Sequence, residues 1–353
     1  MEQPAMAVDR TGRPVVVVGG SAGGLEALRS FVAGLSADFP APVLVVIHIP
    51  ATGPSRLAEV LSRAGPLPAT QAHHLDALLP GRILVAPPDR HLLVQDGLVL
   101  LGTGPKENRH RPAIDALFRT AARWHGPGVV GVVLSGALDD GASGAAAIAA
   151  QDGQVVVQDP DDALVSAMPR AALNAVRRAL VAPAVDLGEL VTGLVRRSAP
   201  VGTVLSPSSE ASMTTAAPLP EHPAAGRPMA LGCPDCHGGM FEQISGELPY
   251  YACHVGHSWS PQTLLDAQRH AVEAALWNAA SKLLEVALVH DRLAEAERAA
   301  SPAGEAHRDG HRRAAKHART QANAVSELIS RAVPDVLDDA VAAGRLPVAA
   351  EEG

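Results

Sequence analysis

Aromatic residues and cysteine are scarce in this chain of 353 residues. Phe, Trp and Tyr make up 3% of it, so Val, Leu and Ala must fill the core, for which a hydrophobic content of 47% is enough. No run of residues approaches the ~20 consecutive apolar residues of a membrane span. We therefore expect a protein with a sizeable aliphatic core and no membrane insertion.

The amino-terminal residues and the net charge narrow the class of protein further. The first ten residues, MEQPAMAVDR, lack the apolar stretch of a signal peptide, so we expect a cytoplasmic protein. In that compartment the three cysteines are not expected to form a disulfide. A net charge of −8 argues against general nucleic-acid binding, and the length favours two domains.

A glycine-rich turn follows the first apolar run. Val15–Gly24 reads VVVVGGSAGG, and a helix-compatible segment, Leu25–Leu35, comes next. The glycines around Ser21 permit backbone angles and close approaches that a Cβ would block. The serine hydroxyl then lies near a helix N-terminus, where free N–H groups favour negative charge. Such a turn suits a nucleophile, but also the cradle of a phosphate or a tight turn without chemistry.

Two further apolar runs end in polar residues. His48 stands near the end of Pro42–Ile49, and Val129–Gly136 opens into Asp139 and Asp140. Because sites in open α/β sheets form at the carboxyl ends of the strands, these residues can meet Ser21 as the parts of a serine hydrolase. The chain order Ser, His, Asp differs from that of an α/β-hydrolase. Taken singly, the histidine can be structural and the aspartate can cap a helix.

Further stretches combine with the glycine-rich turn into a pattern typical of one family. They read FPAPVLVVIHIP at Phe39–Pro50, LLPGRILVAPPDRHL at Leu78–Leu92, HRPAIDALF at His110–Phe118, GVVGVVLSGALDDGASG at Gly128–Gly144 and MPRAAL at Met168–Leu173. In this order, the chain over about residues 13–190 resembles the catalytic domain of the chemotaxis protein-glutamate methylesterases. The resemblance implies an enzyme that removes methyl groups from glutamate methyl esters of chemoreceptor cytoplasmic domains and deamidates receptor glutamines. It begins too early in the chain to leave room for the receiver domain that many members carry.

The family's site residues are carried over by motif. The resemblance makes Ser21 the nucleophile, His48 the general base and Asp140 its orienting carboxylate, because the family's aspartate directly precedes a glycine. Ala22 and Ala137 stand where many members carry Thr and Met, which leaves the substrate preference open. Three polar residues of the matching segments either line the cleft or hold loops: His91, His110 and Arg111.

Alternating strand and helix patterns in the first half predict an α/β fold. Repeated β–α units indicate a doubly wound, mainly parallel sheet with an antiparallel hairpin over residues 91–101. We assign residues 13–195 to this catalytic domain. Residues 196–228 are rich in Ser, Pro, Ala and Thr, which favours a flexible linker, with an extended segment wrapped on the domain as the alternative.

All three cysteines lie close together after the linker. Cys233 and Cys236 form a C-x-x-C pair, and Cys253 is followed by His257 in CHVGH. This spacing predicts a tetrahedral Cys₃His site for a structural zinc in a ribbon-like module over residues 229–260. A closed site of four ligands leaves no position for catalysis, so no cofactor is expected for the reaction itself.

The last segment, 261–340, carries a helical pattern. Thr263–Ala299 is predicted to form one helix and Glu305–Val333 a second that returns antiparallel. The apolar stripe of the first helix is expected to pack inside this hairpin, with pairing into a homodimer as the alternative. The stripe comprises Val272, Leu276, Ala279, Leu283, Val286 and Leu293.

Three functions remain open from the sequence. The first is the serine-type methylesterase that the resemblance implies. The second is a signalling scaffold with a degenerate esterase site, an alternative that Ala22 and Ala137 favour. The third is a zinc-dependent interaction protein in which the α/β half only supports folding. Separately, we expect the zinc module and the helices to replace the receiver domain, either as a docking module for receptor or signalling proteins or as a lid.

Overall fold

The protein folds into two compact units, here in a computed structural model that describes residues 14–48, 55–198, 226–245, 248–297 and 302–332. The first unit extends to Leu265, and the second begins at Asp266. Among the helices of these ranges, none combines the length and the apolar character that a membrane crossing needs.

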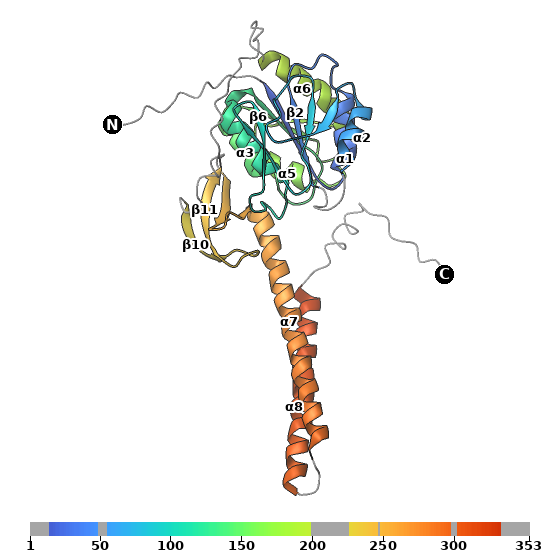
Figure 1. Ribbon diagram of the computed structural model, residues 1–353, viewed down its shortest axis with the longest axis vertical. Helices are drawn as coiled ribbons and strands as arrows, with labels where there is room; N and C mark the ends of the chain where they lie inside the picture. The colour runs from blue at the N-terminus through green and yellow to red at the C-terminus, as the bar shows by residue number, and fades with distance from the viewer. Residues whose placement is uncertain (1–13, 49–54, 199–225, 246–247, 298–301, 333–353) are drawn as a thin grey trace, which may run out of the picture. The chain divides into compact units, whose positions relative to one another are not determined.

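A seven-stranded parallel sheet forms the centre of the first unit (Figure 1). Its order is β3-β4-β2-β1-β7-β8-β9, so that β1 lies between β2 and β7. The chain therefore builds outward from β1 in both directions, which confirms the predicted doubly wound sheet. The strands are β1 (Val15–Gly20), β2 (Val43–Ile47), β3 (Ala69–Gln71), β4 (Ile83–Val85), β7 (Val129–Val133), β8 (Gln154–Gln158) and β9 (Leu180–Ala182).

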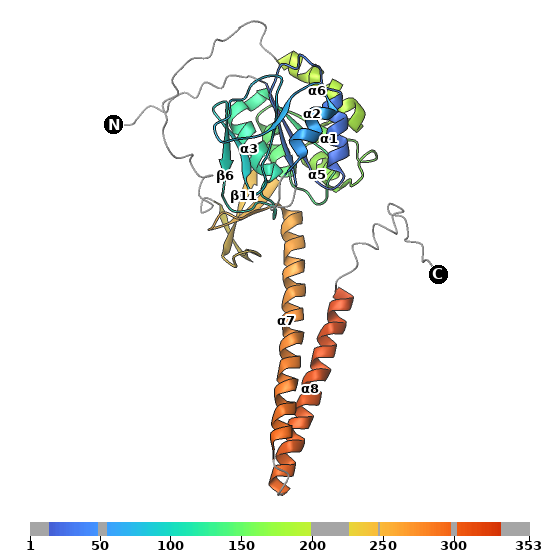
Figure 2. The ribbon, with the colours of Figure 1, turned by 45° about the vertical axis from the view of Figure 1, so that its right-hand side comes forward.

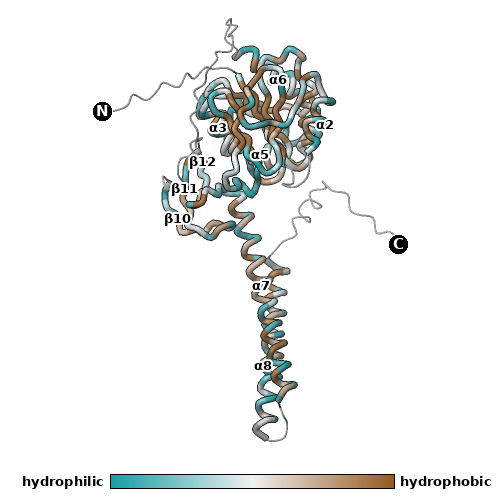
Figure 3. Tube along the Cα trace, in the orientation of Figure 1, coloured by the Kyte–Doolittle hydropathy of each residue, from teal (hydrophilic) through white to brown (hydrophobic). Residues whose placement is uncertain are grey.

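Both faces of this sheet are covered by helices, which explains why the strands read as continuous valine runs. Side chains alternate between the faces. Val16 and Val18 lie in one buried cluster and Val15 and Val17 in the other. Figure 3 shows the hydrophobic residues concentrated in these strands. The first face is covered by α1 (Gly24–Ala33), α2 (Leu57–Ala64) and α6 (Ala184–Ser198), the second by α3 (Ile114–His125), α4 (Ala142–Ala150) and α5 (Ala167–Ala175).

The predicted antiparallel hairpin is present as β5 (His91–Gln95) and β6 (Leu98–Gly102), which pair with each other in a separate two-stranded sheet. A short 3₁₀ turn, Gly126–Gly128, precedes β7. The short elements were not predicted from the sequence, because strands of three residues carry too little periodicity to stand out. They include β3 and β9.

A four-stranded antiparallel sheet follows within the same compact unit. It runs in the order β10-β11-β12-β13, and β11 and β12 form a hairpin between Cys236 and Cys253. Residues 199–225 of the predicted linker lie outside the described residues; α6 reaches Ser198 before them and β10 begins at Arg227 after them. The strands are β10 (Arg227–Gly232), β11 (Gly239–Ser245), β12 (Leu248–Cys253) and β13 (Ser258–Trp259).

Two long helices, α7 (Pro261–Ala296) and α8 (Pro302–Ala332), form the hairpin of the second unit and lie side by side in Figures 1 and 2. They run antiparallel, as predicted. His290 lies against His311 with their Nδ1 atoms 2.9 Å apart, while Glu297, directly after the end of α7, pairs with His307, earlier in α8.

The predicted stripe of α7 is not the seam of this hairpin. Val272, Val286 and Leu293 are 44–57% exposed, whereas Ala287 is buried against Ala315 and Ala318 of α8. Alanines bury the seam because their short side chains let the two helix backbones approach closely. The expectation that the larger residues pack inside the hairpin was therefore wrong for these positions. The buried alanines of α7 recur every seven residues, at Ala280, Ala287 and Ala294.

Candidate active site

Three polar residues meet at the carboxyl edge of the central strands. Ser21 follows β1, His48 follows β2, and Asp140 lies in the loop after β7. Because β2 and β7 flank β1 on opposite sides, this is the point at which the sheet order reverses, where sites of open α/β folds form.

The side chains form a continuous hydrogen-bonded series. Ser21 Oγ lies 3.1 Å from His48 Nδ1, and His48 Nε2 lies 2.8 Å from Asp140 Oδ2. An ionised carboxylate only accepts hydrogen bonds, so the imidazole proton lies on Nε2 and leaves Nδ1 free to accept from the serine hydroxyl. The geometry is that of a nucleophile, a base and an orienting carboxylate.

Asp140 is held ionised by its surroundings. Its carboxylate is 2% exposed and accepts hydrogen bonds from the backbone N–H groups of Ile114 and Asp115 at the start of α3. Burial by itself would raise the pKa of Asp140, but the hydrogen bonds from His48, Ile114 N–H and Asn108 outweigh it and hold the pKa well below its usual range. Asp140 thus acts on the histidine and caps a helix N-terminus at the same time.

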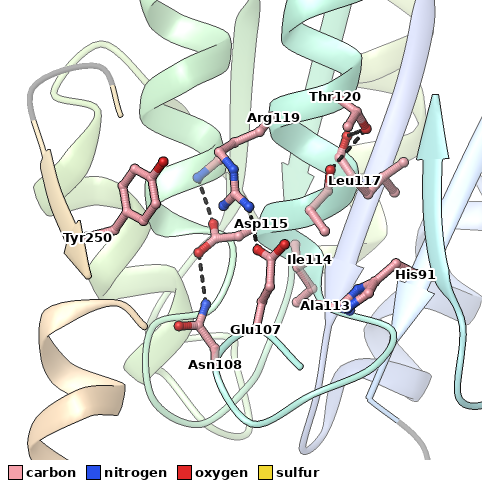
Figure 4. A network of polar contacts seen from close by, with 12 residues as sticks. His91, Glu107, Asn108, Ala113, Ile114, Asp115, Leu117, Arg119, Thr120 and Tyr250 are labelled. Carbon is pink, nitrogen blue, oxygen red and sulfur yellow. Dashed lines mark hydrogen bonds and ion pairs between the residues drawn. The ribbon is translucent and has the colours of Figure 1, made fainter. Parts of the chain in front are cut away.

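A second buried carboxyl, Asp115, lies beside Asp140 and caps the neighbouring helix. Its Oδ1 accepts from Gly141 N–H and Gly144 N–H at the start of α4. Burial and the nearby Asp140 carboxylate raise the pKa of Asp115 to about 8. The side chain of Asn108 bridges the two. Its Nδ2 lies 2.9 Å from Asp115 Oδ2 (Figure 4) and 2.8 Å from Asp140 Oδ1. Asp115 and Asn108 were missed from the sequence; a carboxylate among the apolar residues of a helix start was the available signal.

The turn after β1 leaves backbone donors beside the nucleophile. Gly23 adopts the left-handed φ of 73° and precedes the first residue of α1. The N–H groups of Ala22 and Gly23 have no acceptor within the ranges that the structure describes. A Cβ at Gly136 would lie 2.9 Å from the Ser21 Cβ, so the loop after β7 approaches the serine closely, and Ala137 follows directly. These N–H groups are the candidates to stabilise an oxyanion.

The structure gives different roles to His91, His110 and Arg111, the three polar residues whose role the sequence left open. His110 stacks on His48, with ring centroids 3.5 Å apart and planes inclined by 8°. His91 is instead buried, and its Nε2 lies 2.9 Å from the Pro105 carbonyl oxygen. Arg111 donates to Asp89 and to backbone carbonyls of residues 103–104. Of these three residues, His110 contacts His48, and the other two hold loops.

The stacked histidine carries a testable pH dependence. Burial, with the neighbouring His48 next, lowers the pKa of His110 from 6.5 to about 4; Arg109 and Lys106 also lower it, and Asp140 opposes them. The unfolded chain therefore binds the proton more tightly, and folding stability is lost as the pH falls from 6.5 toward 4.

His110→Phe keeps an aromatic ring on His48 and removes this titration. Between pH 6.5 and 4.5, the wild type is expected to lose about 2 kcal/mol of unfolding free energy more than the variant, measured by urea denaturation. Parallel losses in the two proteins would show that His110 is not held neutral by its site.

The predicted metal ligands also come together. The ligand atoms of Cys233, Cys236, Cys253 and His257 all lie within 4.8 Å of one another, and the three cysteines are free thiols. Cys236 Sγ and Cys253 Sγ are 3.6 Å apart, and Cys253 Sγ is 3.5 Å from His257 Nδ1. A tetrahedron of ligands at the Zn–S distance of about 2.3 Å has edges of about 3.8 Å, so the arrangement fits this ion.

Comparison with known proteins agrees with the fold and the site. Residues 16–191 match the CheB methylesterase family. The chain is 38% identical over 186 residues to "Protein-glutamate methylesterase/protein-glutamine glutaminase 2" of Caulobacter vibrioides, covering 51% of this chain and 54% of that protein. It is 41% identical over 185 residues to enzyme 5 of the same name from Anaeromyxobacter dehalogenans, covering 51% of each. The chain thus spans about half the length of the curated relatives it matches.

The crystal structure of the Thermotoga maritima CheB methylesterase catalytic domain is similar over nearly its whole length. The similarity has a TM-score of 0.50 and 32% sequence identity, and it covers 98% of that domain and 52% of this chain. The resemblance inferred from the sequence motifs is therefore confirmed, and this chain belongs, through its α/β domain, to the CheB methylesterase family.

Proposed function

We propose that the α/β domain hydrolyses methyl esters of glutamate side chains in chemoreceptor cytoplasmic domains and releases methanol. The hydrogen-bonded series Ser21, His48 and Asp140 carries this proposal. An intact series favours an enzyme over the alternative of a binding module with a degenerate site.

The geometry supplies each step of the hydrolysis. His48 Nδ1 accepts the Ser21 proton as Oγ bonds to the ester carbonyl carbon, and the resulting oxyanion is stabilised by backbone N–H groups at Ala22 and Gly23 or at Ala137. The tetrahedral intermediate collapses when His48 returns the proton to the departing methoxide, so methanol leaves. Water, deprotonated by the same histidine, then releases the glutamate. With a glutamine side chain, the same steps release ammonia, the second activity that we propose.

Methanol release tests the proposed function directly. The full chain is expected to release methanol from a methylated chemoreceptor cytoplasmic fragment and none from the unmethylated fragment, and to release ammonia from a fragment that carries glutamines at those sites. If no methanol is released although the fragment is retained in a pull-down with the chain, the protein binds receptors without acting on them.

For the cysteine and histidine set, we propose one structural zinc ion per chain. The spacing of the four ligand atoms supports it. Thiols grouped around one point, rather than paired as a disulfide, also suit the reducing cytoplasm, where we place the protein. His237 and His254 are not in the set, and His254 packs against Phe241 with ring centroids 4.8 Å apart.

For the helical hairpin, we propose that a second copy of the chain pairs with α7. Val272, Ala279, Val286 and Leu293 recur every seven residues and are exposed, which is the pattern of a coiled-coil seam. Val286→Glu places a charge in the middle of this row. The full chain is expected to be a dimer by light scattering and this variant a monomer, while a monomeric wild type would rule the pairing out.

A further inference from the structure

Two residues that take no part in the proposed chemistry connect the triad to the chain after the cysteine and histidine set. Asn108 and Asp139 both neighbour Asp140: the first through a hydrogen bond, the second through the chain. Both are also hydrogen-bonded to Ser258–Thr263, the segment that leads from His257 into α7. We call this segment the clamp.

Asn108 is fixed from three directions. It is 3% exposed, and its Oδ1 accepts from the backbone N–H of Ser260 at 2.7 Å. Its Nδ2 donates to the carboxylates of Asp115 and Asp140. Its backbone N–H donates to the Ser258 carbonyl oxygen at 2.8 Å.

These partners define the orientation of the amide. The clamp offers a donor, which requires the amide oxygen, whereas the ionised Asp140 carboxylate only accepts and requires the amide NH₂. If the amide rotated, its oxygen would face Asp140, and two buried carboxyls would lose the donor that separates them. The cost of such a mismatch in a buried site makes the Ser260 N–H the contact that aligns Asn108 with Asp140.

Asp139 anchors the same segment from the other side of Asp140. Its Oδ1 accepts from Ser260 Oγ at 2.6 Å and from Thr263 Oγ1 at 2.7 Å, and both hydroxyl-bearing residues are buried. Ser260 Oγ also accepts from Thr263 N–H at 3.3 Å, as the cap of α7. The first turn of α7 and the loop that carries Asp139 and Asp140 are therefore held as one piece.

The clamp is continuous with the proposed zinc site. Ser258 directly follows His257 and pairs in β13 with β12, the strand that ends at Cys253. Its carbonyl is the acceptor for the Asn108 backbone. A second contact supports the same junction, because Arg119 of α3 forms an ion pair with Glu107 and lies over the ring of Tyr250 in β12, 5.5 Å from the ring centroid (Figure 4).

We propose that the clamp positions the triad: through Asn108 and Asp139 it aligns Asp140 with His48, so that the folded state of the cysteine and histidine module sets the rate of ester hydrolysis. The proposal rests on the proposed esterase function. Asn108, Ser260 and Thr263 are positioning residues that touch neither the ester nor the reacting atoms. Without zinc, Ser258 is no longer held in place, and its hydrogen bond with the Asn108 backbone is lost. The zinc-loaded module therefore activates the adjacent esterase site.

Thr263 offers a matched pair of variants. Thr263→Val keeps the shape of the side chain and removes its hydrogen bond to Asp139, whereas Thr263→Ser keeps the hydroxyl. In the zinc-loaded full chain, Thr263→Val is expected to lower kcat about threefold to tenfold, as the loss of one buried hydrogen bond allows, with KM unchanged. Thr263→Ser is expected to restore kcat. Thr192→Val in α6 is the control for a lost threonine hydroxyl. It removes a hydroxyl that donates to the Gly188 carbonyl oxygen, outside the clamp.

Asn108→Ala and zinc removal test whether the two parts are coupled. Asn108→Ala is expected to lower kcat about 10²-fold, because a base displaced by an ångström costs about that much. Zinc removal is expected to lower the kcat of the wild type strongly and that of Asn108→Ala little further, since both changes release the same contact. The low-field proton resonance of His48 Nε2–H, which is hydrogen-bonded to Asp140, is expected to broaden or shift in both cases. It is expected to stay unchanged in the control variant Asn323→Ala, which alters an exposed asparagine of α8.

Two outcomes overturn the proposal, and both are distinct from failure of the esterase function. The first is a folded Thr263→Val with the kcat and His48 resonance of the wild type. The second is a zinc-free chain whose seven-stranded sheet is folded and whose His48 resonance is still that of the wild type. The resonance requires no substrate, so it decides the proposal even if the wild type releases no methanol.

Discussion

Ser21→Ala is expected to abolish methanol release from the methylated receptor fragment, with a loss in kcat of about 10⁴-fold or more. The Ser21 hydroxyl oxygen lies 3.1 Å from His48 Nδ1, and alanine removes it without adding volume. The backbone of the turn is retained, because Ser21 N–H donates to the Ser135 carbonyl oxygen in either protein. The measurement is methanol released per enzyme at saturating substrate.

Ser30→Ala, in the second half of α1, is the control for loss of a serine hydroxyl and is expected to keep full activity. Binding of the receptor fragment is expected to survive in Ser21→Ala, since the change leaves the surface otherwise intact. Residual turnover near the wild-type rate in Ser21→Ala would remove the serine from the proposed mechanism. Loss of binding together with turnover would indicate that the turn recognises the receptor rather than attacks it.

Removal of the metal is expected to unfold the four-stranded sheet while the seven-stranded sheet stays folded. Structural zinc contributes on the order of 10 kcal/mol to small modules of this kind, and buried aromatic residues are few here to replace it. The central sheet has its own core on both faces and needs no ion. Hydrogen exchange is expected to become fast for β10 to β12 on chelation and to change little for β1, β2 and β7.

Cys233→Ser is expected to reproduce chelation and to lower bound zinc well below one ion per chain, because the serine hydroxyl is a poor ligand beside thiolates. His254→Gln is the control within the same module, since His254 lies outside the ligand set. Equal protection of β10 to β12 with and without metal would show that the sheet folds without an ion. Bound zinc that is unchanged in Cys233→Ser would place the metal elsewhere.

Deletion of residues 229–353 separates the parts of the protein at a coarser level. The clamp lies within the deleted stretch, so the truncated chain should have a folded central sheet and reduced turnover. Unchanged turnover and unchanged receptor binding would show that the C-terminal half serves neither activation nor docking.

Local sequence determined the central sheet and the candidates for its site. Valine runs such as Val15–Val18 are apolar on both faces, which only a strand buried on both sides tolerates, and that requirement predicted the covered parallel sheet. The glycines around Ser21 predicted a turn with no room for further side chains. The cysteine spacing predicted the ligand set because both pairs are local in the chain and a knuckle forms within a few residues.

Tertiary structure alone decided which polar groups support the triad. Ser260 reaches Asp139 across 121 residues of chain and Asn108 across 152, and no local pattern encodes a contact at such separation. Asp115 and Asp140 cap each other's helices only because α3 and α4 begin side by side, and the stacking of His110 on His48 likewise joins residues that are distant in the chain. The seam of α7 formed on Ala280, Ala287 and Ala294 rather than on the larger residues, since the partner helix, not the hydrophobicity of one helix alone, selects the face that is buried. Backbone preferences and burial are properties of a segment, whereas the partner of a buried polar atom is a property of the packed chain.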